Sequence, residues 1–282
     1  MRILLFFMGI FIPILYLFGG ESASDFEAAK ELSGKLDKPI LIDFMAEWWS
    51  GCKAFAREAK SDETLIQNLD SVILLTIDCE KNDGPQLAKT FNIQGYPTFV
   101  LANNQAQTLY RWWGYEKDFF LTSLKAGLAD LTTIDEKIVR FKSEPDSSTA
   151  VALASYYDTQ EAYSDAITYY KKAAELSNFS KDYGFEIFMD YYSGYRSDQF
   201  TNDELKNSAK NALVSTSIES EEKGQVYYYM SNMITKNNND SDFLNFIKNG
   251  QEYFTELTDK KYERQKEAIN ILNYEYSFQE YL

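Results

Sequence analysis

The stretch DFMAEWWSGCKAF, residues 43–55, joins a predicted strand to a predicted helix. Residues 40–44 form an apolar run of strand length that contains a single acid, a pattern typical of a buried central strand. A helix is predicted over residues 51–60. Two adjacent tryptophans, Trp48 and Trp49, occupy the turn, and only one cysteine follows them. The stretch therefore predicts a strand-turn-helix unit with two indoles and one thiol.

The residues on either side of this unit continue the alternation of helices and strands. Helices are predicted over residues 25–36, 85–91 and 116–129, and strands over residues 71–78, 97–103 and 108–113. This order is typical of an α/β domain, in which helices cover a central sheet.

Beyond about residue 132 the strand patterns end and long helical patterns begin. Residues 132–147 are expected to form a linker, because their polar end contains Pro145. Residues 148–282 are predicted to form an all-α domain of about three stacked helical hairpins. Its later helices are expected over residues 183–195, 203–214, 222–235, 241–257 and 259–280. The first hairpin resembles one tetratricopeptide repeat at Leu153, Ala154, Tyr157, Ala166, Tyr170 and Ala173.

Composition and charge exclude several classes of function. The net charge of −15, with no cluster of Lys and Arg standing out against it, argues against nucleic-acid binding. The chain has no histidine, which excludes histidine-based acid/base catalysis and histidine-ligated metal sites. Its two cysteines fall short of the roughly four ligands of a structural zinc site. We therefore expect neither a metal nor a cofactor.

The N-terminus has the pattern of a secretory signal peptide, predicted over residues 1–24. A basic start precedes an apolar run over residues 3–18, and small and polar residues follow. The run is shorter than the roughly 18–20 apolar residues that span a bilayer, so cleavage near Ala23 or Ser24 is favoured over a retained anchor. We expect an extracytoplasmic protein that contacts a membrane only through this segment, if it stays uncleaved.

Four stretches, in order, resemble the thioredoxin superfamily, especially extracytoplasmic bacterial members. They are KPILIDFMAEWWSGCK, LLTID, LAKTFNIQGYPTFVL and RWWGY. The resemblance covers residues 25–131 and implies a thioredoxin fold, with a central mixed sheet flanked by helices, in the bacterial periplasm or a secreted location. Followed by helical repeats, this layout is also similar to that of chaperedoxin-type co-chaperones, which lack a signal sequence.

The resemblance places Trp49 at the position of the nucleophilic cysteine and Cys52 at that of the resolving cysteine. Disulfide exchange requires attack by a thiolate, and an indole has no comparable lone pair. The ordinary two-cysteine cycle is therefore unavailable, and we expect no dithiol-disulfide oxidoreductase turnover.

Three further positions match functional positions of the family. Asp43 matches the buried acid that assists proton transfer at the resolving cysteine. Tyr96 and Pro97 match the cis-proline turn that faces the active site and exposes backbone groups to an extended peptide. Gly114 matches a position beside the same groove.

Each of these residues also has a purely structural interpretation. Cys52 is either a working thiol or a small buried core residue. Asp43 is either a proton carrier or an inherited buried acid, and Pro97 is chiefly architectural. A Cys52–Cys79 disulfide would require Cα atoms within about 7 Å, which the sequence does not establish.

The tryptophans allow two arrangements. Trp48 and Trp49 either form an exposed apolar platform with Tyr96 and one tryptophan of the Trp112–Trp113 pair, suited to unfolded polypeptide, or Trp48 packs inward. Strand alternation places Trp112 and Trp113 on opposite faces, so at most one joins the groove.

Two functional hypotheses follow. In the first, the groove and the helical repeats bind polypeptide clients or partner proteins in a chaperone-like or scaffold role. In the second, Cys52 acts as a single thiol that protects client cysteines or supports residual exchange with help from Asp43.

Overall fold

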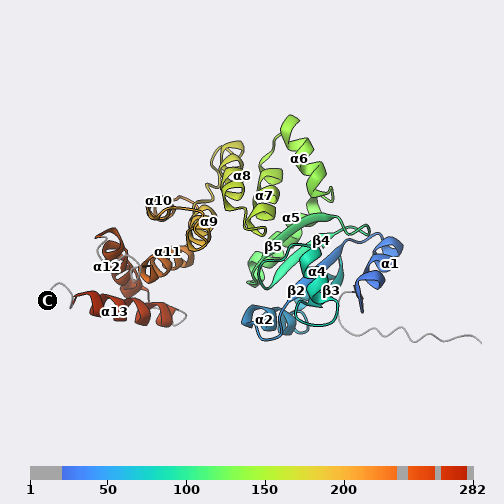
Figure 1. The fold of residues 1–282 in the computed structure, drawn as a ribbon, viewed down its shortest axis with the longest axis horizontal. Coiled ribbons are helices and arrows are strands. Elements are labelled where there is room, and N and C mark those ends of the chain that lie inside the picture. The colour runs from blue at the N-terminus through green and yellow to red at the C-terminus, as the bar shows by residue number, and fades with distance from the viewer. Residues whose placement is uncertain (1–20, 234–240, 258–261, 278–282) are drawn as a thin grey trace, which may run out of the picture.

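The computed structural model describes residues 21–233, 241–257 and 262–277. An α/β domain at one end of the molecule continues into an extended array of helices (Figure 1). Residues 1–20 of the predicted signal peptide lie outside the described residues.

The α/β domain is built on a five-stranded mixed sheet with the strand order β1-β3-β2-β4-β5. Strand β2 pairs in parallel with β3 and antiparallel with β4, which pairs antiparallel with β5. The predicted thioredoxin fold class is therefore confirmed. The strands are β1 (Glu21–Ser22), β2 (Ile40–Met45), β3 (Ile73–Asp78), β4 (Thr98–Ala102) and β5 (Thr108–Trp113).

The sheet begins before residue 25, where the domain was expected to start. Strand β1 pairs with β3, placing Glu21 opposite Ile73, and the N–H of Ala23 donates to Leu74 O over 3.1 Å. A cut after Ala23 or Ser24 would therefore remove this strand.

Helices cover both faces of the sheet, because alternate residues of each strand point to opposite faces. Leu41 and Phe99 lie in the core beneath α2, α3 and α5, whereas Ile42 and Val100 lie in the core beneath α1 and α4. The helices are α1 (Phe26–Leu36), α2 (Ser50–Glu58), α3 (Glu63–Leu69), α4 (Gly84–Thr90) and α5 (Lys117–Ala129). Helix α3 was not predicted, since its seven residues span too few turns for a clear periodicity.

The linker predicted over residues 132–147 is largely wrong, because it contains helix α6 (Ile134–Ser143). Thr133 and Glu136 form a capping box at its start. Ile134 and Phe141 are buried against the next helix, α7 (Ser147–Asp158). Only the residues around Pro145 connect one helix to the next.

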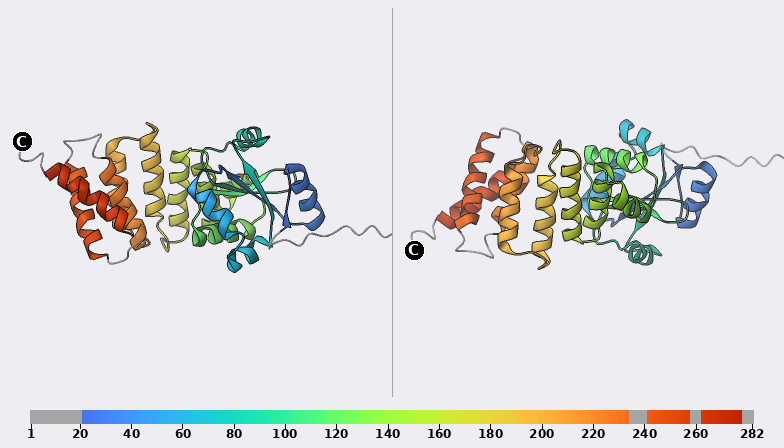
Figure 2. Two further views of the ribbon diagram at one scale, coloured as in Figure 1. Left: turned by 90° about the horizontal axis from the view of Figure 1, so that it is seen from below. Right: turned by 90° about the horizontal axis from the view of Figure 1, so that it is seen from above.

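The remaining helices form three successive hairpins and a final helix, which follow one another away from the sheet (Figure 2). Within the first hairpin, all but Tyr157 of the six repeat-like positions are buried. The helical-hairpin prediction is therefore confirmed. After α7 come α8 (Tyr163–Leu176), α9 (Gly184–Arg196), α10 (Asn202–Leu213), α11 (Ser220–Asn232), α12 (Ser241–Glu256) and α13 (Glu263–Ser277).

The sheet and the helical array share a buried boundary. Strand β5 is an edge strand, and α7 packs against it. The hydroxyl of Ser155 donates to Arg111 O over 2.6 Å. The buried Arg111 guanidinium in turn donates to Phe91 O (2.7 Å) and to Thr159 O (3.3 Å), at the end of α7. The two parts are therefore joined by hydrogen bonds as well as by apolar packing.

Replacing Arg111 with methionine should lower the free energy of unfolding by about 2 kcal/mol, since two buried carbonyl oxygens lose a charged donor. Urea denaturation followed by tryptophan fluorescence would measure the change. Arg57→Met is the matched control, because that side chain is 70% exposed and pairs only with its neighbour Glu58. Equal stability of the two variants would contradict this account of the boundary.

Candidate functional site

The candidate site begins at the N-terminus of α2. Trp49 is the N-cap residue, with an extended backbone (φ −77°, ψ 133°), and its side chain is 43% exposed. Trp48 is 59% exposed, and the two rings meet edge to face with centroids 5.4 Å apart. The Trp48 indole N–H donates to Glu80 Oε1 over 2.9 Å. The structure therefore has the exposed pair of indoles and not the inward-packed Trp48.

The Tyr96–Pro97 peptide bond is cis and lies beside Trp49. A Cβ placed on Gly51 would lie 3.3 Å from Pro97 Cδ and 3.5 Å from Trp49 Cδ1, so Gly51 lies close to both residues. The N–H of Gly114 donates to Pro97 O over 2.8 Å, and its φ of 82° favours glycine. The structure thus gathers the predicted positions 49, 97 and 114 around one turn.

Trp112 and Trp113 are adjacent on β5, so their side chains point to opposite faces of the sheet. Trp112 is 1% exposed and stacks on Phe99, with ring centroids 5.4 Å apart. Trp113 is 45% exposed, and its ring lies beside Gly95. The predicted placement of Trp112 and Trp113 on opposite faces is confirmed, and the exposed residue is Trp113.

Two exposed indoles therefore lie near the cis turn: the Trp49 ring lies close to Gly51, and the Trp113 ring lies beside Gly95. Within the described residues, no hydrogen bond holds the backbone N–H or C=O of Tyr96. Free backbone groups in an extended segment are available to pair with an extended peptide.

Both sulfurs lie beneath this surface. Cys52 is 1% exposed, and burial, followed by the negative charge of Asp43, raises the pKa of its thiol. Burial raises the pKa of Cys79 to about 12. Both are free thiols, so the disulfide left open by the sequence is not formed in this structure. Thiols of this kind supply little thiolate at neutral pH.

Asp43 is the acid beneath the groove. Its side chain is 2% exposed, and burial raises its pKa to about 7. No group in the described part of the chain hydrogen-bonds its Oδ1 atom. The carboxyl group is therefore poised to exchange a proton near neutral pH, but no nucleophile stands at position 49 to use it.

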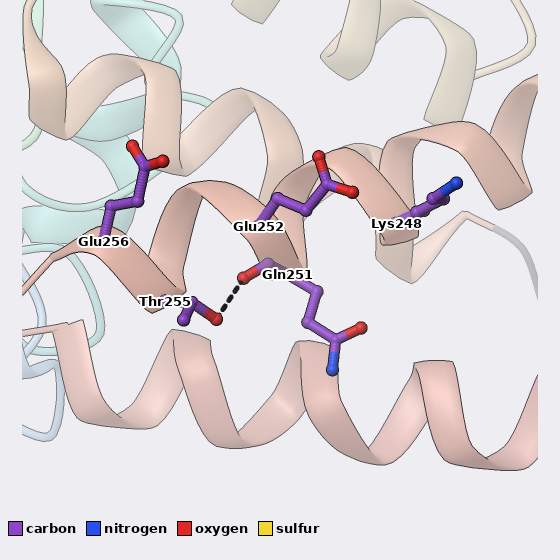
Figure 3. Close-up of a pocket in the computed structure, with 5 residues that line it drawn as sticks. All are labelled: Lys248, Gln251, Glu252, Thr255 and Glu256. Carbon is purple, nitrogen blue, oxygen red and sulfur yellow. Dashed lines mark hydrogen bonds between the residues drawn. The ribbon is translucent and has the colours of Figure 1, made fainter.

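A different hollow lies along α12 (Figure 3). Its lining side chains are Lys248, Gln251, Glu252, Thr255 and Glu256, all from one helix, so they form only one wall. Such an arrangement does not bring reactive groups together from several elements. It is not the candidate site.

The described residues contain no cluster of three or more side chains placed to hold a metal ion. None of their helices combines the length and apolar character needed to cross a bilayer.

Three contributors to the site were missed in the sequence. Gly51 and Gly95 allow the indoles of Trp49 and Trp113 to approach the cis turn, and Glu80 anchors Trp48. Gly95 could have been recognised in the sequence as part of the site, because it lies two residues before Pro97. Glu80 lies 32 residues from Trp48, and no local pattern connects them.

Comparison with solved structures finds thioredoxin-like domains. A thioredoxin from Thermus thermophilus is 19% identical, with 38% of this chain and 86% of that chain covered and a TM-score of 0.35. A structure described as DsbH oxidoreductase is 17% identical, with 40% of this chain and 88% of that chain covered and the same TM-score.

Sequence relatives include thiol:disulfide interchange proteins DsbD. The protein from Campylobacter jejuni strain RM1221 is 32% identical over 88 residues, which is 30% of this chain and 16% of that relative. The protein from Actinobacillus pleuropneumoniae serotype 5b (strain L20) is 27% identical over 85 residues, which is 29% of this chain and 15% of that relative. The chain therefore spans only a small part of these relatives.

The family model for thioredoxin matches residues 21–120. This segment contains all five strands of the sheet, the tip of α2 and the cis-proline turn. Residues 21–120 are therefore a thioredoxin domain, which the chain joins to a region of helical hairpins.

Proposed function

We propose that this chain is an extracytoplasmic thioredoxin-like protein that binds extended polypeptide in a chaperone-like or scaffold role, without dithiol turnover. The observation that carries the proposal is the exposed Trp49 indole at the N-terminus of α2, where Gly51 lies close to both this ring and Pro97. A thiolate would have to stand there for disulfide exchange.

The surface around this indole suits an apolar, extended ligand. Three large side chains, Trp48, Trp49 and Trp113, are each more than two-fifths exposed. Exposed aromatic groups of this size are typical anchors of protein interfaces. The backbone of Tyr96 offers an N–H and a C=O between them, so side-chain burial and main-chain pairing are available to the same ligand.

The extracytoplasmic location is supported by the signal-like pattern of residues 1–24, and the net charge of −15 disfavours nucleic acid and anionic lipid as partners. The relatives are named for thiol:disulfide interchange, but this chain keeps only the second sulfur of the active-site pair. Interchange is therefore not part of the proposed function.

The alternative is a single-thiol redox role for Cys52. The Asp43 carboxyl group favours this role, because a carboxylate with a pKa of about 7 can accept a proton from a nearby thiol. Burial of Cys52 opposes it, because a 1% exposed thiol with a raised pKa reacts slowly. Labelling of the folded protein with a thiol reagent separates the two functions. Rapid labelling of Cys52 together with covalent capture of a client thiol would favour the redox role.

Replacing both Trp48 and Trp49 with alanine should weaken binding of a carboxymethylated, permanently unfolded polypeptide by about tenfold, since two anchoring indoles are lost. Fluorescence anisotropy with a labelled polypeptide would measure the dissociation constant. Phe179→Ala is the matched control, because that ring is 63% exposed and lies beyond the end of α8. Unchanged binding by the double variant would place recognition in the helical hairpins.

A further inference from the structure

A second hollow lies where the thioredoxin domain meets the first hairpin. Gly95, Thr98 and Trp113 line it from the domain, and Asp158, Glu161 and Tyr163 line it from the end of α7 and the start of α8. Its cavity volume is about 40 Å³. Since about 10–15 Å³ holds one water molecule, the hollow has room for about three water-sized groups. It can therefore take the tip of a side chain, but not a ring system.

Two carboxyl groups, those of Asp158 and Glu161, line this hollow. Asp158 and Asp190 are hydrogen-bonded to each other, and burial raises the pKa of both. Two adjacent carboxyl groups in such a site share one proton. Burial raises the pKa of Asp190 further than that of Asp158, so the shared proton rests on Asp190 and the negative charge on Asp158. Glu161, which is exposed, adds a second charge at the rim.

The nearest cation is already engaged elsewhere. Arg111 favours the ionised form of Asp158 through its charge, but its guanidinium donates to the backbone oxygens of Phe91 and Thr159. Among the ion pairs of the described residues, none contains Asp158 or Glu161. A half-buried carboxylate that forms no ion pair is a favourable partner for a cation supplied by a ligand.

Aromatic rings complete the walls. Trp113 is 45% exposed, and its indole N–H favours the ionised form of Asp158 by hydrogen bonding. The Tyr163 ring is buried at the opposite side. A carboxylate beside an indole and a phenol ring attracts an organic cation by its charge, and the rings offer apolar contact to the carbon atoms next to that cation.

The hollow lies close to the cis turn. Trp113 and Gly95 line it, the Trp113 ring lies beside Gly95, and Gly95 stands two residues before Pro97. The hydroxyl of Thr98 donates to Gly95 O over 2.7 Å and holds this wall in place. A polypeptide lying across the cis turn would therefore pass the mouth of the hollow.

We infer that the hollow between Trp113 and Asp158 binds the side-chain ammonium of a lysine in a polypeptide held on the groove. This inference rests on the proposed function and specifies the chemistry of its ligand. A primary ammonium with its last methylene groups matches the size of the hollow, and its three donors match the carboxylates of Asp158 and Glu161.

Four labelled extended peptides, identical except for lysine, arginine, norleucine or glutamate at one central position, test the inference with the full chain. We expect the lysine peptide to bind about tenfold more tightly than the norleucine peptide and the glutamate peptide to bind most weakly. Asp158→Asn should remove the preference for lysine and leave the affinity for norleucine unchanged. The control Asp165→Asn makes the same charge change at an exposed position in the first turn of α8 and should keep the preference.

Each outcome decides a separate point. Binding of lysine and norleucine peptides with equal affinity would overturn this inference and leave the proposed function standing. Failure of every peptide to bind would overturn both. If the arginine peptide bound as tightly as the lysine peptide, the assignment of a lysine ammonium group as the ligand would be wrong. Should Asp158→Asn fail to fold, Glu161→Gln at the exposed rim should still reduce the lysine preference by about twofold to threefold, and an unchanged preference would count against the inference.

Discussion

Replacing Trp49 with cysteine should give this protein a disulfide reductase activity that the parent lacks. The new thiol would stand at the N-terminus of α2, three residues before Cys52. A helix N-terminus favours the thiolate, and the turn at Pro97 and the acid Asp43 are already in place beside it. Reduction of insulin by dithiothreitol at pH 7 would measure the activity, which we expect to exceed that of the parent by at least about tenfold.

Three controls isolate the role of position 49. Trp48→Cys adds a thiol to the neighbouring exposed position, and Trp49→Ser removes the indole without adding sulfur. Combining Trp49→Cys with Cys52→Ser removes the resolving thiol and should leave a mixed disulfide without turnover. A parent protein that reduces insulin as fast as Trp49→Cys, or an equally active Trp48→Cys, would contradict the assignment of the lost nucleophile.

Replacing Asp43 with asparagine should raise the free energy of unfolding, and more so at high pH. Burial raises the pKa of Asp43 from 3.8 to about 7, so the folded state holds its proton more tightly than the unfolded state. The wild type therefore loses stability as the pH rises from about 4 to about 7, and the loss stays constant above that. A pKa that is about three higher in the folded state than in the unfolded state lowers the free energy of unfolding at high pH by about 4 kcal/mol.

Urea denaturation at pH 5 and pH 8.5 would test this dependence. The gain from Asp43→Asn should be larger at pH 8.5 by about 2–3 kcal/mol, because about two units of the shift lie between these pH values. Asp165→Asn, at an exposed position, serves as the control and should show no such difference. An equal gain at both pH values would contradict the raised pKa of Asp43.

Much of the fold was predictable because its elements are amphipathic or apolar over enough residues to show a period. The strands around residues 40–44 and 108–113 and the five later helices were expected close to where they lie. The misses have two physical causes. Helix α3 has only seven residues and β1 only two, too few for a clear period. Helix α6 was obscured by the polar residues and Pro145 that follow its end.

The candidate site likewise has features that the sequence predicted and features that depend on tertiary contacts. Alternation along β5 predicted that Trp112 and Trp113 face opposite sides, but which of them is buried depends on the core beneath α5 and on Phe99. The exposure of Trp48 depends on Glu80, which a different segment supplies. The acidic hollow was not predicted, since residues 95, 113 and 158 come together only when α7 covers the edge of the sheet.

The sequence by itself determined which atoms are available: an indole at position 49, one sulfur three residues later, an acid on the central strand, no histidine and a strongly negative charge. Only the tertiary structure decided how those atoms behave. Burial made Cys52 a poor nucleophile, raised the pKa of Asp43 and left the indoles exposed around a cis turn. The reason is that chemical identity is local to each residue, whereas solvation and proximity depend on segments far apart in the chain.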